Sequence, residues 1–534
     1  MNQKLPKVAY LCMEYAVNSD IKTYAGGLGI LAGDYLKGAK DEQLPIVGVG
    51  LKWKQGYTRQ HLNDKDRVVD SYENHPYDGF EDTGKSVTVR IRNRDVVCKI
   101  WKATDWGVSE LYLLDTDVPE NADTWITGQL YGWFGEERVA QEMVLGIGGV
   151  RALKELGIDV DVYHFNEGHA VLAAIELLQN YKADGLSFEH AWEKTRAKVV
   201  FTTHTPVIQG NESHPPELLS YMGAVGDLSQ EEVHQLGGTP FNMTVAALQL
   251  CRASNGVAQL HGETARKMWA HVEKAPEIIG ITNGIHKPTW VDSRIQEAKD
   301  HPDLLWDVHM SLKNDLIAFV KERTGQQLDS NKMIIGFARR AVAYKRSNLI
   351  FQAGDAVIEA LKAGKIQVVF SGKAHPLDDG GKDIVHEIVA FSRQYPGSIV
   401  FLEDYDMDIG AMLTRGSDVW LNNPRRPQEA CGTSGMKAAM NGVLNLSVLD
   451  GWWPEACQHG VNGWAIGDDH VPESFEEQDA RDAKFLGETL IQDVLPTYYD
   501  DRQKWITMMQ ESINSVTEPF SVDTMLKSYF EKLY

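Results

Sequence analysis

The segment 423–437 carries side chains that could hold a phosphorylated cofactor. It contains a carboxylate, Glu429, followed by small residues that are expected to open a helix. A helix start offers free backbone N–H groups and the positive end of the helix dipole, and both attract phosphate. Lys437 follows Thr433 by four residues, so both side chains leave the same face of the first turn. A lysine beside a phosphate cradle suits a cofactor that binds as a Schiff base and carries its own phosphate; the alternative is an ordinary surface helix with an exposed lysine.

A cluster of cations follows a segment that the sequence predicts to be a buried strand, residues 333–339. Arg339 and Arg340 end this strand, and Lys345 comes five residues later. Side chains at the carboxyl end of a parallel strand face the ligand crevice. Guanidinium donors match phosphate oxygens in pairs, while a lysine adds a compact charge. The alternative is a solvated basic patch.

Polar residues end three predicted strands in the N-terminal half. His204 follows one strand, Asn283 ends another, and the segment 166–169 ends a third. Sugar hydroxyls need many directional hydrogen bonds, so these residues suggest a sugar-binding rim, although each one alone could be an ordinary loop residue. His164 lies near the histidine and the glutamate of 166–169, but the spacing is not that of the zinc helix pattern. No metal site is therefore predicted.

Length and charge restrict the kind of protein. The 534 residues exceed one ordinary hydrophobic core, so two domains with a cleft between them are expected. A net charge of -22 argues against a nucleic acid or an anionic membrane as the main partner. The five cysteines are scattered and odd in number, which predicts no disulfide framework. With no apolar signal segment and no long apolar run, we expect a cytoplasmic protein.

The order of predicted elements indicates an α/β fold made of two doubly wound halves. A first strand is followed by the glycine turn 25–29 and a helix, as in folds that bind phosphate at a helix start. Strands and helices then alternate in two series, which predicts parallel sheets covered on both faces. From residue 57 to residue 118 the period changes to two, as the alternation in 87–100 illustrates, and this predicts an inserted antiparallel hairpin unit.

These patterns set the expected domain boundaries. An N-terminal Rossmann-like domain covers residues 1–290 and includes an inserted hairpin unit at about 57–118. A C-terminal Rossmann-like, cofactor-binding domain covers 291–495. Helices in 496–534 could return to the N-terminal domain.

Taken together, these segments resemble the glycogen and α-glucan phosphorylases, in particular the compact bacterial type. The matching segments occur in family order over most of the chain, at residues 24–29, 164–169, 202–205, 282–285, 339–346 and 429–450. The resemblance implies a two-lobed GT-B architecture with two Rossmann-like domains facing a cleft. It also implies a pyridoxal 5'-phosphate cofactor on Lys437 and an enzyme that carries out reversible phosphorolysis of α-1,4-glucan to α-glucose 1-phosphate.

The resemblance also implies roles for single residues. Inorganic phosphate would be held by Arg340, Lys345 and the backbone N–H of Gly27. The cofactor phosphate would be held by Arg339, Thr433 and Ser434, with Trp290 and Tyr405 lining the cofactor pocket. The glucosyl unit would be held by His204, Asn283, Glu429, Cys431 and Gly432.

The mechanism implied by the resemblance retains the anomeric configuration. The cofactor phosphate exchanges a proton with the substrate phosphate, which protonates the leaving oxygen and then joins the sugar on the same face. Glu429 is a partner of sugar hydroxyls in this scheme, because a nucleophile of a retaining hydrolase would need a second positioned carboxylate. The partners are thus an α-glucan and inorganic phosphate, with a homodimer left open.

The chain departs from the family pattern at several positions. Arg339 replaces a lysine and Cys431 a serine, while Asp406 stands where an arginine often lines the pocket and Ala16 replaces an aromatic ring. Two rival functions stay open. A GT-B glycosyltransferase that uses a nucleotide sugar would not join a cofactor to Lys437, and a non-catalytic glucan-binding protein would release no glucose 1-phosphate.

Overall fold

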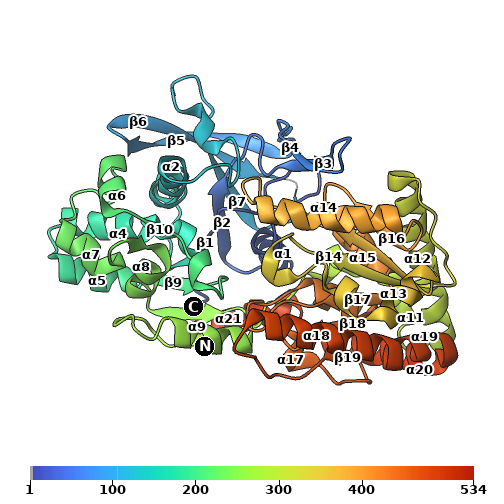
Figure 1. The fold of residues 1–534 in the computed structure, drawn as a ribbon. Helices are drawn as coiled ribbons and strands as arrows, with labels where there is room; N and C mark the ends of the chain where they lie inside the picture. The colour runs from blue at the N-terminus through green and yellow to red at the C-terminus, as the bar shows by residue number, and fades with distance from the viewer. Residues whose placement is uncertain (1–3, 105) are drawn as a thin grey trace. The chain divides into compact units, whose positions relative to one another are not determined.

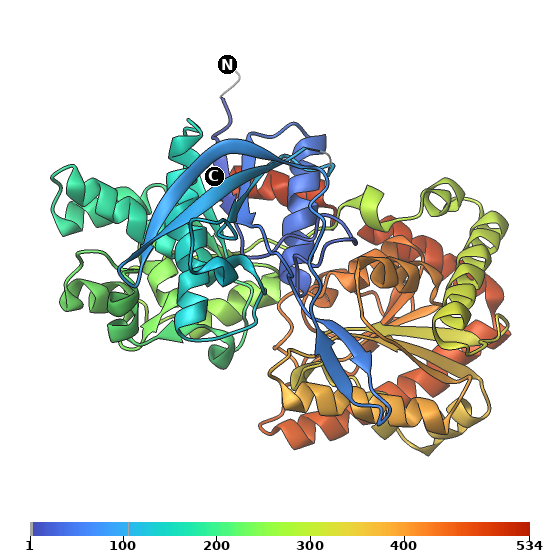
Figure 2. The same cartoon turned by 90° about the horizontal axis from the view of Figure 1, so that it is seen from above.

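The computed structural model describes residues 4–104 and 106–534, which fold into two compact units (Figures 1 and 2). The first unit comprises Met1–Thr58, Tyr72–Thr282 and Val522–Tyr534, and the second comprises Arg59–Ser71 and Asn283–Ser521. The domain boundaries predicted from the sequence, at 290 and 495, stay a prediction. Within the described residues, no helix is both long enough and apolar enough to cross a membrane.

The first unit is built on a nine-stranded sheet with the order β13-β12-β9-β8-β1-β2-β7-β6-β5. Its parallel strands are short and largely buried, as expected for a sheet covered on both faces. They are β1 (Val8–Leu11), β2 (Ile46–Leu51), β7 (Glu110–Asp115), β8 (Val162–Asn166), β9 (Val199–Thr202), β12 (Ala253–Gly256) and β13 (Ile278–Gly280). The alternating segment forms the antiparallel pair β5 (Phe80–Ile91) and β6 (Arg94–Ala103) at one edge.

Helices connect these strands and pack on the sheet (Figure 1). They are α1 (Gly27–Asp41), α2 (Glu136–Met143), α3 (Gly149–Glu155), α4 (Leu172–Ala183), α5 (Phe188–Arg196), α6 (Pro216–Met222), α7 (Gln230–Gly237), α8 (Met243–Leu250), α9 (Gln259–Met268) and α21 (Val522–Lys532). The two-stranded pair β10 (Ser213–His214) and β11 (Phe241–Asn242) lies beside them.

The sequence predicts one long helix at 135–157, and its internal glycines at 146, 148 and 149 predict close helix packing. The helix is present with one irregularity. Between α2 and α3 the chain forms a π-helical turn at Val144–Gly148. A Cβ added at Gly146 would lie 2.5 Å from the backbone nitrogen of Ala173 in α4. Close helix packing therefore requires glycine there, as the sequence predicted.

One predicted element is wrong in its placement. The local sequence pattern predicts a helix at 243–254 and then a strand at 256–259, but α8 ends at Leu250 and β12 spans Ala253–Gly256. This strand contains Ser, Asn and Gly, which have low strand propensity. Its conformation is fixed by pairing with β9 and β13, which a local pattern does not reveal.

The second unit is built on a six-stranded parallel sheet with the order β16-β15-β14-β17-β18-β19. The strands are β14 (Met333–Ala338), β15 (Ile366–Ser371), β16 (Ile399–Leu402), β17 (Val419–Asn422), β18 (Leu444–Val448) and β19 (Gly463–Ile466). A separate hairpin, β3 (Arg59–Leu62) and β4 (Val68–Ser71), joins this unit and contacts α14 (Asp379–Gln394).

The other helices of the second unit flank its sheet (Figure 2). They are α10 (Lys287–Trp290), α11 (Ser293–Ala298), α12 (Pro302–Thr324), α13 (Asp355–Lys362), α15 (Met407–Gly416), α16 (Ser434–Met440), α17 (Trp453–Ala456), α18 (Phe475–Thr489), α19 (Leu495–Asp500) and α20 (Arg502–Val516). The local sequence pattern predicts one helix at 347–363, but the chain forms a 3-10 turn, Leu349–Gln352, and then α13. Gly354, with a φ of 106°, separates the two pieces.

Two largely parallel sheets with helical connections confirm the predicted α/β class. Each unit has the largely parallel, helix-flanked sheet of the Rossmann-like domains that the sequence resemblance implies. In such sheets, side chains that follow the carboxyl ends of neighbouring strands lie at one edge, which is where ligands bind.

Candidate active site

Four of the strands in the second unit end in residues that could bind a ligand. Arg339 follows β14, Tyr405 follows β16, Glu429 follows β17 and Asp450 follows β18. Strands β14 and β17 are parallel neighbours in the sheet. Their carboxyl ends therefore bring the arginine and the glutamate to the same edge, although 90 residues separate them along the chain.

Glu429 binds two cations at this edge. Its Oε2 accepts hydrogen bonds of 2.5 Å from Nη2 of Arg339 and of 2.5 Å from Nζ of Lys345. All three side chains are buried. Burial alone would raise the pKa of the Glu429 carboxyl, but Arg339 and Lys345, with a contribution from Arg340, hold it below its usual value. The carboxylate is therefore ionised at neutral pH.

A second carboxyl group fixes the backbone that carries Glu429. Asp450 accepts the backbone N–H of Glu429 at 2.9 Å and that of Gly451 at 2.8 Å. Burial raises the pKa of Asp450 to about 7, and the neighbouring carboxylate adds to this effect. Gly451 has a φ of 59°, and a Cβ added there would lie 2.2 Å from the carbonyl oxygen of Cys431, so only glycine fits. The sequence motif included Asp450, but its positioning role was not predicted.

The next residues form a compact turn. Gly432 has a φ of 80°, and the carbonyl of Cys431 accepts the backbone N–H of Trp452 at 3.0 Å. The Cys431 thiol is buried, which raises its pKa well above the ordinary value. Asn283 is also buried, and its Oδ1 has no hydrogen-bond partner among the described residues. Such an acceptor is available to a sugar hydroxyl.

Lys437 lies in α16, where its side chain is buried against an aromatic ring. Its Nζ is 3.4 Å from the ring centroid of Trp290, which is itself buried. The carbonyl of Trp290 accepts the side-chain N–H of Asn441 at 3.0 Å, so the tryptophan and this helix are fixed together. Ser434 opens the helix, and its Oγ accepts Nε1–H of Trp420 at 3.2 Å. Thr433 precedes it and makes no side-chain cap.

The remaining predicted residues of this unit have different surroundings. Tyr405 packs on the core, and burial raises the pKa of its hydroxyl to about 12. Asp406, whose charge was unexpected for a phosphate pocket, caps α15 by accepting the backbone N–H of Ile409 at 3.0 Å. Its carboxylate thus has a local structural function. Arg340 is exposed, unlike Arg339.

In the first unit, the glycine turn before α1 is held by a glutamate that the sequence did not single out. Oε2 of Glu14 accepts the backbone N–H of Ala25 at 2.7 Å and of Gly26 at 3.2 Å, and Oε1 accepts the hydroxyl of Tyr131 at 2.8 Å. Gly27, the first residue of α1, is exposed. Its backbone N–H is therefore at an open helix start.

His204 is fixed by two residues of the strand-end segment 166–169. Its Nε2 lies 2.5 Å from Oδ1 of Asn166, and its backbone N–H donates to Oε2 of Glu167 at 2.9 Å. Glu167 has a φ of 78°, in a region that is strained for residues other than glycine. Residues with such strain are concentrated at functional sites. Burial lowers the pKa of His204 to about 3, so the imidazole is neutral.

Comparison with known proteins identifies the family. Residues 293–459 match the model of the carbohydrate phosphorylases. The maltodextrin phosphorylase of Thermococcus litoralis is 37% identical over 99% of this chain and 70% of its own length. The glycogen phosphorylase of Aquifex aeolicus is 36% identical over 99% of this chain and 86% of its own length. An uncharacterized protein of Methanocaldococcus jannaschii is 37% identical over 98% of this chain and 99% of its own length. The resemblance seen in the sequence is confirmed, and the chain belongs to the carbohydrate phosphorylase family.

Proposed function

We propose that this protein catalyses the reversible phosphorolysis of an α-1,4-glucan, such as glycogen, starch or maltodextrin, and releases α-glucose 1-phosphate with retention. The names of its relatives, maltodextrin phosphorylase and glycogen phosphorylase, support this substrate class. The observation that carries the proposal is the buried group formed by Arg339, Lys345 and Glu429. In a chain with a net charge of -22, two buried cations at a strand edge indicate a local anion site.

The cations serve to hold phosphate. We assign inorganic phosphate to Lys345 and to the exposed Arg340. Two phosphate groups in contact repel strongly where the dielectric constant is low, so fixed positive charges are needed to keep them together. In the first unit, the backbone N–H of Gly27 and the imidazole of His204 are candidates for binding substrate oxygens.

The residues around Lys437 fit pyridoxal phosphate. The lysine is buried against the ring of Trp290 at 3.4 Å, which is a suitable wall for a flat aromatic group. Nη1 of Arg339 is a buried donor that lacks a hydrogen-bond partner among the described residues, as a phosphate-binding group would before its ligand arrives. Thr433, Ser434 and Tyr405 complete the proposed cofactor contacts. When bound, the cofactor supplies a phosphate group that exchanges a proton with the substrate phosphate.

The protein's own side chains bind and orient the sugar. Glu429 is ionised and accepts hydrogen bonds from sugar hydroxyls, while Asn283, Cys431 and Gly432 line the same region. His204 is neutral and donates to Asn166, so it is not the acid that protonates the leaving oxygen. We assign that proton to the inorganic phosphate, which then attacks the glucosyl cation from the same face. Retention follows, because the departing and arriving oxygens share one side of the ring.

The activity is tested by measuring glucose 1-phosphate released from maltoheptaose and phosphate. We expect product from the wild-type protein loaded with pyridoxal phosphate, and none above background from Lys437→Ala. Lys362→Ala is the matched control, because this lysine is exposed on α13 and pairs only with Glu359 among the described residues. Glucan binding without product, or transfer from a nucleotide sugar without any need for phosphate, would contradict the proposal.

The cofactor is tested separately by borohydride reduction and peptide mass mapping. We expect a pyridoxyl group on the peptide that contains Lys437 and an unmodified lysine in every other peptide. An unmodified Lys437 in a folded, cofactor-treated sample would contradict the assignment.

A further inference from the structure

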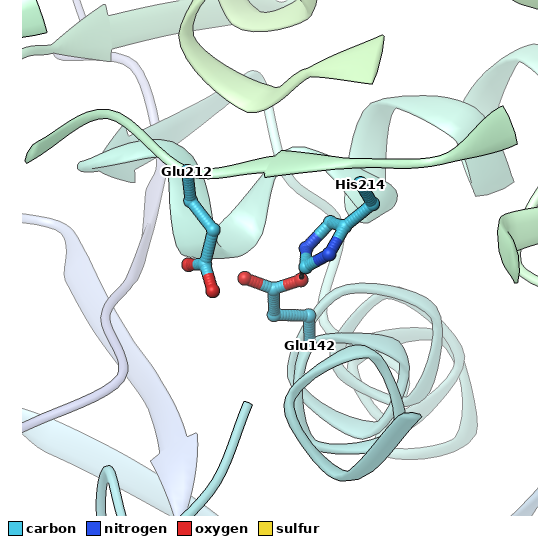
Figure 3. A group of neighbouring side chains, drawn as sticks. All are labelled: Glu142, Glu212 and His214. Atoms are coloured by element: carbon cyan, nitrogen blue, oxygen red, sulfur yellow. Dashed lines mark hydrogen bonds and ion pairs between the residues drawn. The ribbon is translucent and has the colours of Figure 1, made fainter. Parts of the chain in front are cut away.

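A group of side chains that commonly ligate metals lies inside the first unit (Figure 3). Glu142 comes from α2, Glu212 precedes β10, and His214 belongs to β10. One donor atom from each lies within 4.8 Å of the other two. We propose that Glu142, Glu212 and His214 bind one divalent transition-metal ion.

The arrangement of the donors suits a single ion. Nε2 of His214 lies 3.0 Å from Oε2 of Glu142. Atoms bound to one ion at about 2.1 Å are roughly 3 to 3.5 Å apart, so this pair already has the spacing of two neighbouring ligands. Figure 3 shows Glu212 and His214 descending from one strand segment toward Glu142, which rises from the helix. Small side-chain rotations would bring the third donor to the same point.

An unpaired oxygen gives an independent indication of a missing ligand. Glu142 is fully buried, and its Oε1 has no hydrogen-bond partner among the described residues. This is the oxygen that no dashed line joins to His214 in Figure 3, and it is directed at the carboxylate of Glu212. Two carboxylates that face each other with an unpaired oxygen need either a proton or a cation between them.

The surrounding charges leave room for a cation. Nη1 of Arg138 contacts the two oxygens of Glu212 at 3.2 and 3.3 Å, and Nε2 of His169 lies 3.8 Å from Oε2. One guanidinium therefore faces two carboxyl groups.

The donor set selects the class of metal. Carboxylates alone favour Ca²⁺ and Mg²⁺, whereas an added neutral imidazole favours Mn²⁺, Fe²⁺, Co²⁺ or Zn²⁺. The ion would join α2 to β10, and its ligands lie 72 residues apart in the chain. The sequence predicted no metal because only local spacing was considered.

The proposal is tested by titrating Zn²⁺ and Mn²⁺ into chelator-treated, full-length protein in competition with a chromophoric chelator. We expect one ion per chain and weaker binding of Ca²⁺ and Mg²⁺. Glu142→Gln and His214→Phe should each lower the affinity by about a hundredfold or more. His234→Ala is the matched control, since this histidine is exposed on α7, and it should bind like the wild type.

A measurement on the wild-type protein covers the case in which the variants do not fold. X-ray absorption of the Zn²⁺-loaded protein should show only nitrogen and oxygen ligands, including imidazole. A folded wild-type protein that binds no stoichiometric ion, a zinc site without imidazole, or folded variants with unchanged affinity would each overturn the proposal.

Discussion

Two buried glutamates, one in each unit, have opposite surroundings. Glu429 in the second unit accepts hydrogen bonds from Arg339 and Lys345, and its pKa is held below the usual value despite burial. Glu142 in the first unit faces Glu212 and a neutral histidine, and burial raises its pKa well above the usual value. Burial acts on both in the same direction, so the partners decide which carboxyl group is ionised.

The difference separates two kinds of site. Three cations, Arg339, Lys345 and Arg340, act on the single carboxylate of Glu429. This excess of positive charge suits the binding of anions such as phosphate. At Glu142 the carboxyl groups exceed the nearby cations, which suits a proton or a metal ion.

The largest expected contrast is between Glu429→Gln and Glu142→Gln. Removing the Glu429 charge leaves two buried cations uncompensated, which should lower the free energy of unfolding by about 3 to 5 kcal/mol. The rate of phosphorolysis should fall by about a hundredfold or more, because the proposed hydrogen bonds from sugar hydroxyls to the Glu429 carboxylate are lost. Glu142→Gln resembles the protonated side chain already present and should change stability by less than about 1 kcal/mol in metal-free buffer. Denaturant unfolding measures the change in stability of each variant, and the phosphorolysis assay measures its activity. Equal losses in the two variants would contradict the assigned difference between the two glutamates.

A smaller effect concerns metal-induced stabilisation. If an ion binds only the folded state, a concentration one hundred times its Kd adds about 2.7 kcal/mol. Zn²⁺ or Mn²⁺ should therefore raise the Tm of the wild type and of Glu429→Gln, but not that of Glu142→Gln. Thermal unfolding with and without chelator checks this. A rise that persists in Glu142→Gln would show that the ion binds elsewhere.

The loss of protein stability at acid pH should depend on the ionisation of Glu429. Its folded pKa lies below the ordinary glutamate value of about 4.3, so its stabilising contribution is present above that value and is lost as the pH falls through the folded pKa. Between about pH 5 and about pH 3, wild-type stability should fall more steeply than that of Glu429→Gln. Unfolding curves across this range would contradict the assignment if the two slopes were the same.

The smallest effect is expected at Cys431. Its thiol is buried with a raised pKa, and its backbone carbonyl makes the contact with Trp452. Cys431→Ser should keep the phosphorolysis rate within about threefold, since a side chain of similar size replaces one that carries no charge. Iodoacetamide should leave the activity of the folded wild type intact, because the thiolate is the reactive form. Rapid inactivation that Cys431→Ser prevents would contradict this.

Much of the fold could be predicted from the sequence because its signals are local. Buried strands such as β14 appear as apolar runs, and parallel sheets then place Arg339 and Glu429 at neighbouring strand ends. The strand β12 was misplaced, since its residues Ala253–Gly256 become a strand only through pairing with neighbours.

The sequence names the candidate residues of the site but not their pairings. The sequence assigned Arg339 and Lys345 to phosphates and did not show that both bind Glu429, a contact between segments more than 80 residues apart. The group of Glu142, Glu212 and His214 was invisible for the same reason. By contrast, the cap formed by Asp406 at the start of α15 is a local pattern that could have been recognised.

Proton NMR of maltoheptaose incubated with phosphate and the cofactor-loaded protein tests the central claim most directly. We expect a new anomeric signal of α-glucose 1-phosphate that appears only when phosphate is present and is missing with Lys437→Ala. Release of free glucose, formation of the β-anomer, or an unchanged glucan with folded, cofactor-loaded protein would contradict it.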